Sequence, residues 1–201
     1  VIVLHGLDGE MDPLAVQLAL KLTEEFSGLL PISMAGGADA FNLSELLAGG
    51  LSPVTVCSDL LKPGGYGRLS QYLENLRAQM KDLGAETPHS FICQKAVSEP
   101  DRRQVLEELF PSQVSDNGLA LDSSVWTAFW DSFEKTGEGP ARERVAMAAK
   151  DVCSDEAQAQ TMEEQFVPVC ARVNLAAYAE KTRTSERYDK PLRWVSPKTD
   201  R

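Results

Sequence analysis

Short apolar runs alternate with amphipathic stretches over the first 83 residues of the chain. Apolar runs at residues 1–4, 31–35 and 54–57 have the length and the β-branched content of buried strands. A turn-rich or glycine-bearing loop follows each run, and a helix-like stretch follows each loop. This order predicts β-α-β-α-β-α, the last three βα units of a parallel α/β sheet.

Helical spacing of apolar residues predicts where these helices bury their side chains. The first helix is expected to begin at Pro13 and to stop at Gly28. Its apolar stripe, expected to face the core, consists of Leu14, Leu18, Leu22 and Phe26, with Ala15 and Ala19 beside them. The helix expected over residues 68–83 has a second such stripe, formed by Leu69, Leu73, Leu76 and Met80.

Beyond Gly84 strand signals nearly vanish and helix-forming residues take over. The expected helices span residues 102–110, 124–135, 141–152 and 156–181, and Pro168 is expected to bend or break the last of them. Four aromatic residues recur at steps of three and four, which is typical of a packed core: Trp126, Phe129, Trp130 and Phe133. The chain therefore divides into an α/β part at 1–83 and a mostly helical region at 84–201.

Composition narrows the classes of partner. The 201 residues include 30 acidic and 20 basic side chains, which gives a net charge of −10, and no cluster of five Lys or Arg interrupts this balance. Nucleic acid and anionic membrane surfaces are therefore poor partners. Since no apolar run reaches the ~18 residues of a membrane span and no secretory leader is present, we expect a cytoplasmic location.

The cysteines and histidines give no catalytic or metal site. Four cysteines lie far apart without a C-x-x-C pair, so neither a zinc site nor an iron–sulfur ligand set is predicted, and free thiols are expected: Cys57, Cys93, Cys153 and Cys170. His5 and His89 have no assignable partner carboxylate, and the catalytic residues stay unknown.

Two adjacent strand ends carry the residues that a phosphate site needs. Gly36 and Gly37 follow the second apolar run, and Ser58 follows the third. The helix between these runs, residues 41–48, is expected to be capped by Asp39 or Asn42. Since parallel strands end at the same edge of a sheet, the N–H groups of both turns can converge on one dianion.

Several segments resemble a known family of flavoproteins. Residues 31–42 (PISMAGGADAFN), 53–69 (PVTVCSDLLKPGGYGRL) and 6–22 (GLDGEMDPLAVQLALKL) are similar to the large flavoprotein family named for a selenate reductase subunit. That family is related to the FMN-binding (β/α)8 barrels of dihydropyrimidine and dihydroorotate dehydrogenases. The tail segments NLAAYAEKTRTSERYDKP and SPKTDR resemble the helical lead-in to its iron–sulfur domain.

The resemblance implies a cofactor and the residues that hold it. Residues 1–83 would form the C-terminal part of an FMN-binding barrel, and 84–201 would lead to an iron–sulfur domain outside this chain. Iron–sulfur clusters, and FAD or NAD(P)H, would also bind outside it, with the remainder of the flavoprotein or other redox subunits as partners. The implied backbone contacts to the FMN phosphate come from Gly9, Gly36, Gly37, Ala38, Cys57 and Ser58.

One position departs from the family pattern, and two other functions stay open. Asp8 stands where relatives carry Ser, and a carboxylate beside Gly9 would repel a phosphate. The first alternative is a non-redox phosphate-binding barrel enzyme of the aldolase or isomerase type. The second is a helical interaction module with a vestigial barrel piece.

Because the chain begins within an apolar run and without Met, we expect a fragment that is inactive alone.

Overall fold

A small parallel sheet forms the centre of the N-terminal part. The computed structural model describes residues 2–5, 13–116, 123–137, 139–153 and 155–184. Its strands are β1 (Ile2–His5), β2 (Ile32–Ala35) and β3 (Val54–Thr55), in the order β1-β2-β3. Both pairs are parallel, with His5 opposite Ala35 and Ala35 opposite Thr55, so the expected parallel sheet is confirmed.

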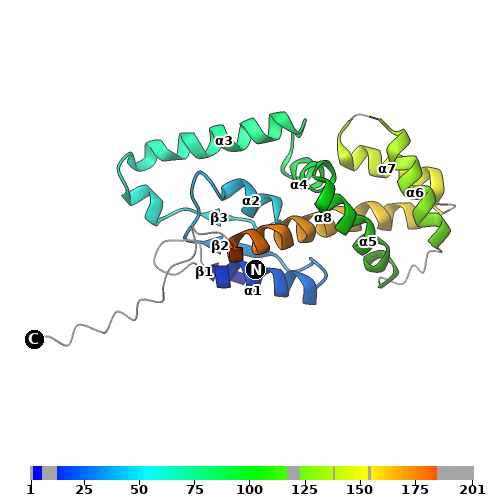
Figure 1. Ribbon diagram of the computed structural model, residues 1–201, viewed down its shortest axis with the longest axis horizontal. Coiled ribbons are helices and arrows are strands. Elements are labelled where there is room, and N and C mark those ends of the chain that lie inside the picture. Colours follow the sequence, from blue (N-terminus) through cyan, green and yellow to red (C-terminus); the bar gives the residue numbers. More distant parts are fainter. Residues whose placement is uncertain (1, 6–12, 117–122, 138, 154, 185–201) are drawn as a thin grey trace, which may run out of the picture.

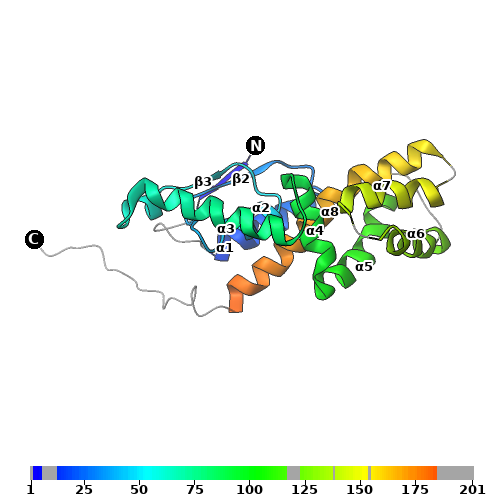
Figure 2. The ribbon, with the colours of Figure 1, turned by 90° about the horizontal axis from the view of Figure 1, so that it is seen from above.

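Helices cover one face of this sheet in two layers. The connecting helices α1 (Pro13–Glu25) and α2 (Leu43–Ala48) lie against the strands, and α8 (Glu156–Thr184) lies on the far side of them (Figures 1 and 2). The core between the layers is apolar and includes Leu4, Val16, Ile32, Met34, Leu46, Leu175 and Tyr178. Burial of this face follows the period-two alternation of the strands.

The opposite face of the sheet carries no helix in Figure 2. Its residues are the alternate ones along the strands, of which Val3 is 52% exposed, Thr55 is exposed and Ala35 is half-buried, whereas Ser33 is buried. Parallel sheets normally bury both faces. This face is therefore more open than is usual for a parallel α/β fold.

The apolar stripe expected to bury α1 is partly wrong. Leu14 is 72% exposed and Leu18 is 46% exposed, although Leu22 packs against the core. The buried residues of α1 are Ala15, Val16, Ala19 and Thr23, of which the two alanines were expected inside. Small side chains let the helix lie close to the sheet, and they leave Leu14 and Leu18 on the outer side.

The second expected stripe is also partly wrong. Helix α3 (Arg68–Asp82) buries Tyr72 fully, while Leu73 is exposed and Leu76 is half-buried. Before α3, the loop after β3 folds into two short 3-10 turns, η1 (Ser58–Leu61) and η2 (Gly65–Gly67).

The C-terminal half is helical, as expected, and contains one helix that the sequence reading missed. The missed helix is α4 (Pro88–Ser98), whose N-terminus is a capping box in which Thr87 and Ser90 each accept the other's backbone N–H. The predicted helices appear as α5 (Pro100–Asp116), α6 (Ser123–Lys135) and α7 (Ala141–Val152). Helix α8 continues through Pro168 without a break.

Aromatic side chains fill the core of this helical part. The expected stripe on α6 lies inside it: Trp126, Phe129 and Phe133 are buried, and Trp130 packs against them. Phe110 of α5 and Phe166 of α8 meet the same group edge to face, with ring centroids 5.2 Å apart for Phe110–Trp126 and 5.3 Å for Phe110–Phe166. The prediction that this stripe is core is confirmed.

Helix α8 joins the two halves because it contributes to both cores. Its first half lies in the aromatic core, and Leu175 and Tyr178 lie in the core beneath the sheet. Asn174 is fully buried between them and donates through Nδ2 to the carbonyls of Ala48 (3.0 Å) and Ile92 (2.9 Å). Within the described ranges, none of the helices combines the length and apolar character that crossing a bilayer requires.

A buried ionic cluster lies where α2, α4, α5 and α8 meet. The Glu45 carboxylate is 12% exposed and pairs with Lys95 Nζ at 3.2 Å, Arg102 Nη2 at 3.7 Å and Lys181 Nζ at 3.6 Å. Lys95 and Arg102 are themselves buried to a similar degree. The Oε2 atom accepts no aligned hydrogen bond, so charge rather than hydrogen-bond geometry holds it.

Candidate functional site

The turn after β2 presents backbone N–H groups at the carboxyl edge of the sheet. Gly36 and Gly37 have φ values of 81° and 72°, a conformation that favours glycine. The Gly36 N–H donates to the Thr55 carbonyl at 3.2 Å, which ties the turn to β3. Among the described residues, neither Gly37 N–H nor Ala38 N–H has a hydrogen-bond acceptor. These two N–H groups are therefore the candidate donors to an anion at this edge.

Side chains in the β2–α2 loop (residues 36–42) fix the shape of this turn. Asn42 donates from Nδ2 to the Gly37 carbonyl at 2.8 Å and accepts from the Asp39 N–H at 2.8 Å. Asp39 in turn accepts from the N–H groups of Phe41 and Asn42. The two residues expected to cap α2 therefore bind each other's backbone and shape the loop, and Asn42 makes no side-chain cap bond to α2.

The end of β3 brings the second set of candidate residues to the same edge. Cys57 is exposed and precedes η1, and Ser58 is half-buried as its first residue. The Cys57 carbonyl accepts from the Leu60 N–H at 3.0 Å. Ala35 lies opposite Thr55 in the parallel pair, so the segments that follow these two residues leave the sheet next to each other.

Asp59 anchors the β3–α3 loop (residues 56–67). Its carboxylate is 4% exposed and accepts from Arg68 Nε at 2.8 Å, Arg68 Nη2 at 3.1 Å and the Tyr72 hydroxyl, while Lys62 Nζ lies 3.0 Å away. Burial alone would raise the pKa of Asp59, but the hydrogen bonds from Arg68, Tyr72 and Lys62 outweigh it and lower the pKa to about 2. Burial, followed by the bond to Asp59, raises the pKa of Tyr72 to about 12.

The lowered pKa of Asp59 predicts an acid-dependent stability. A carboxylate whose folded pKa is below its unfolded value stabilises the fold above about pH 4, and this contribution is lost as the pH falls toward 2. The expected loss is about 2 kcal/mol. Urea unfolding at a series of pH values measures it, and the Asp59→Asn variant should lack this component of the acid slope. Parallel slopes for both proteins would contradict the prediction.

The structure brings together most of the residues expected to form the site. Gly36, Gly37 and Ala38 follow β2, and Cys57 and Ser58 follow the neighbouring β3. Gly9 lies outside the described residues. His89 is exposed on α4, in the other half of the molecule. The sequence did not predict Asp59, Arg68 and Tyr72 as a group; the signal available was Tyr72 one turn after Arg68 on the same helix face.

The cysteines are free thiols, as expected. Cys57 is exposed, Cys153 is intermediate, and Cys93 and Cys170 are buried in the aromatic core. Burial, together with the contact to Cys93, raises the pKa of the Cys170 thiol well above its ordinary value. No three His, Cys, Asp or Glu side chains gather into a possible metal site in the described part of the chain.

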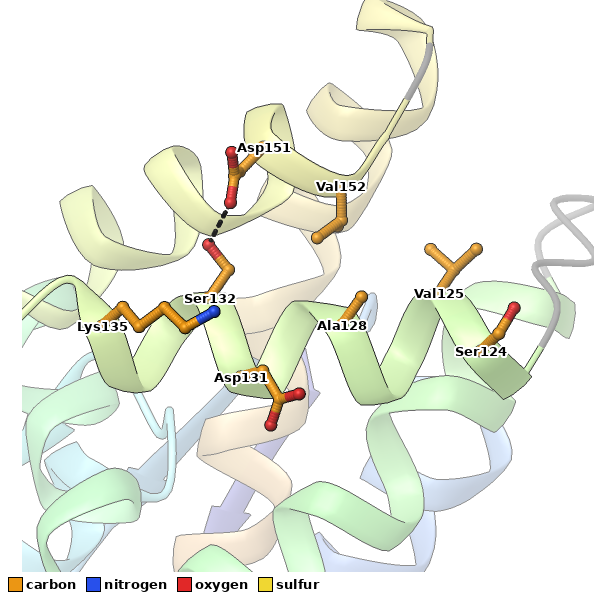
Figure 3. Close-up of a pocket in the computed structure, with 8 residues that line it drawn as sticks. All are labelled: Ser124, Val125, Ala128, Asp131, Ser132, Lys135, Asp151 and Val152. Atoms are coloured by element: carbon orange, nitrogen blue, oxygen red, sulfur yellow. Dashed lines mark hydrogen bonds between the residues drawn. The ribbon is translucent and has the colours of Figure 1, made fainter.

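A second concave region lies between α6 and α7 (Figure 3). This groove of about 490 Å³ contains the Ser132–Asp151 hydrogen bond (2.8 Å) and Lys135 beside it. None of the described residues lining it is His or Cys, so the described lining forms neither a Ser–His nor a Cys–His pair. The strand-end edge is therefore the stronger candidate site.

Comparison with known proteins finds similarity to an oxidoreductase family over just under half of the chain. Residues 9–108 match the family model described as "Oxidoreductase YgfK, N-terminal TIM-barrel domain". Over 64 residues the chain is 44% identical to "Putative oxidoreductase YgfK" of Escherichia coli strain K12 and to the protein of the same name from strain O157:H7. The matched stretch is 32% of this chain and only 6% of each relative's length. No solved structure matches significantly.

These similarities support an oxidoreductase TIM-barrel family and agree with the α/β part of the structure. The matched range contains both candidate loops, α3 and α4, and ends within α5. Helices α6, α7 and α8 lie outside the matched range, whereas the residues that α4 and the first part of α5 contribute to the aromatic core lie inside it.

Proposed function

We propose that this chain supplies the FMN phosphate-binding end of a flavin-dependent oxidoreductase barrel. The observation that carries the proposal is the meeting of two donor-bearing strand ends at one edge of a parallel sheet. Gly37 and Ala38 N–H groups stand on one side and the Cys57–Ser58 turn on the other, and the Gly36–Thr55 bond joins them. In TIM barrels, phosphate groups bind at this end, in the loops after the last two strands.

The residues present fit a phosphate. The Gly37 and Ala38 donors lack competing acceptors among the described residues, and Lys62 is 56% exposed nearby on the β3–α3 loop. Asp59, which could repel an anion, is already satisfied by Arg68, Tyr72 and Lys62. When bound, FMN would supply hydride or single-electron transfer, and these residues would hold its phosphate and so fix the orientation of the flavin.

The exposed faces of the α/β part support its place in a larger barrel. β1 is an edge strand of the described sheet, its residue Val3 is 52% exposed, and the outer side of α1 carries the exposed Leu14 and Leu18. A further βα unit placed next to β1 would pair that edge and cover those side chains. On this proposal β1, β2 and β3 are the last three strands of the (β/α)8 barrel.

The remaining parts of the parent protein belong to the same proposal. Electrons would pass between the flavin and iron–sulfur clusters outside this chain, with other redox segments or subunits as partners. Substrate recognition and the cytoplasmic location stay predictions. The rival phosphate-binding barrel, without electron transfer, shares the same turns and is distinguished by its ligand.

The test is a ligand titration of the ¹⁵N-labelled chain followed by NMR. We expect FMN and inorganic phosphate to shift the amide signals of Gly37, Ala38 and Ser58, and riboflavin, which lacks the phosphate, to leave them in place. A sugar phosphate that shifts them while FMN does not would favour the non-redox rival. The absence of any shift at these amides with all phosphate ligands would exclude the site.

The same protein is expected to lose FMN during gel filtration. The phosphate contacts alone leave the flavin ring without partners, because no helix of the described residues covers the open face of the sheet. The absorbance spectrum of the eluted protein measures the retained flavin. Retention of about one FMN per chain would contradict this prediction and would indicate a ring-binding surface within these 201 residues.

A further inference from the structure

We propose that α3 is a brace that sets the spacing of the two candidate phosphate loops through Arg68, Tyr72 and Asn75. The effect on ligand binding rests on the proposed function, whereas the ordering of the loops does not. These three residues are positioning residues: they are placed to act on the backbone that would contact the phosphate.

The three residues share one face of α3. Positions 68, 72 and 75 follow the i, i+4, i+7 spacing of a helix. Arg68 and Tyr72 donate to Asp59 in the β3–α3 loop. One turn further along, Asn75 donates from Nδ2 to the Ala40 carbonyl in the β2–α2 loop at 2.9 Å. A single helix face therefore holds both loops.

Polar contacts contribute much of what fixes α3 to these loops. Tyr72 is the one buried residue of the helix, and its hydroxyl is bound to Asp59. The exposed Leu73 and the half-buried Leu76 give a weaker apolar contact than the sequence pattern predicts. Loss of one of these hydrogen bonds should therefore loosen the loop that it holds, because no tightly packed core compensates for the lost contact.

The brace also directs charge at the site. Asp59 follows Ser58 directly, so a released carboxylate would lie within a few ångströms of the proposed phosphate. Held by Arg68 and Tyr72, the carboxylate faces α3 instead. The brace therefore has two effects on an anion: it keeps the two donor turns together, and it keeps a negative charge away from them.

The first experiment measures the loops without any ligand. Amide hydrogen–deuterium exchange is compared in the wild type, Tyr72→Phe, Asn75→Asp and the control Leu73→Ala, which changes an exposed residue of the same helix. We expect exchange at residues 57–61 to be about tenfold faster in Tyr72→Phe, and exchange at 38–42 to be about tenfold faster in Asn75→Asp. Exchange as slow as in the wild type in both brace variants would overturn the inference.

The second experiment separates positioning from stability. Inorganic phosphate and FMN are titrated into the same proteins and into Leu76→Ala, which should lower the melting temperature at least as much by removing a half-buried side chain. We expect Tyr72→Phe and Asn75→Asp to raise the apparent Kd about tenfold, Leu76→Ala to leave it unchanged, and the donor-keeping Asn75→Gln to recover much of the affinity.

The outcomes distinguish the two claims. If loop exchange accelerates but the wild type gives no response to phosphate or FMN, the proposed function fails and the brace stands. If phosphate binds and the affinity follows melting temperature alone, with Leu76→Ala as weak as Tyr72→Phe, the brace is overturned and the phosphate site stands.

Discussion

Replacing Gly37 with aspartate is expected to abolish the response of the chain to phosphate and FMN. The new carboxylate would stand beside donors that face the anion, and each pair of unit charges at about 4 Å costs about 4 kcal/mol at an effective dielectric constant of about 20. Even with strong screening, this corresponds to a loss of at least a hundredfold in affinity. NMR titration of the Ser58 amide, on the opposite loop, measures it without relying on the mutated turn.

The matched control is Gly37→Asn. Asparagine has the same size as aspartate and tolerates the same positive φ of 72°, but it carries no charge. We expect Gly37→Asn to bind more weakly than the wild type, because its Cβ restricts the approach, yet clearly better than Gly37→Asp. Equal affinities for the two variants would show that no anion lies at this turn.

The largest expected loss of stability follows from Glu45→Ala. Removing this carboxylate leaves the buried Lys95 without its counter-charge and Arg102 with only the half-exposed Glu99, and breaking a buried pair in this way typically costs about 3–5 kcal/mol. The cluster joins α2 to α4 and α5, so its loss weakens the contact between the two halves of the molecule. Urea denaturation, followed by far-UV circular dichroism, gives the free energy of unfolding.

A surface ion pair provides the control for this substitution. Glu180 pairs with Arg183 at 2.7 Å, but both side chains are more than half exposed. Glu180→Ala should therefore leave the free energy of unfolding nearly unchanged. If Glu45→Ala is no more destabilising than Glu180→Ala, the buried cluster contributes little and the two halves are held together by apolar contacts.

The sequence predicted elements better than it predicted which side of each faces the core. The parallel strand order and most helices were expected, because strand-like runs and helix stop signals are local properties. Leu14 and Leu18 of α1 were expected inside but are exposed, whereas Val16, outside the expected stripe, is fully buried. Which stripe of a helix is covered depends on its neighbours, and the neighbours of α1 in this structure lie on the alanine side.

Helix α4 was missed because its sequence is short and its apolar residues run consecutively. The segment Phe91-Ile92-Cys93 has no clear helical period, and the helix is buried on most sides. Its start signal was nevertheless present in Thr87-Pro88, followed by Ser90. At Pro168 the sequence predicted a bend or a break, but α8 has no break there and packs on both cores.

The candidate site was predictable in its backbone and not in its supporting side chains. Consecutive glycines after a strand are visible in a sequence, so the turn at Gly36 and Gly37 could be singled out. The bond from Asn75 to Ala40 joins residues 35 positions apart, and the Asp59–Tyr72 bond joins residues 13 apart. Such contacts depend on how α3 returns over the loops, which no local pattern specifies.

The close approach of α8 to the turns that follow α1 and α2 has a consequence for how related sequences can diverge. A Cβ added to Gly28 would lie 2.9 Å from Pro168 Cβ, and one added to Gly50 would lie 3.0 Å from Ala171 Cβ. A substitution at either turn is therefore coupled to a substitution on α8. Relatives that keep this arrangement should vary positions 28 with 168, and 50 with 171, as pairs, whereas relatives in which the barrel ends without such a helix are free of that constraint.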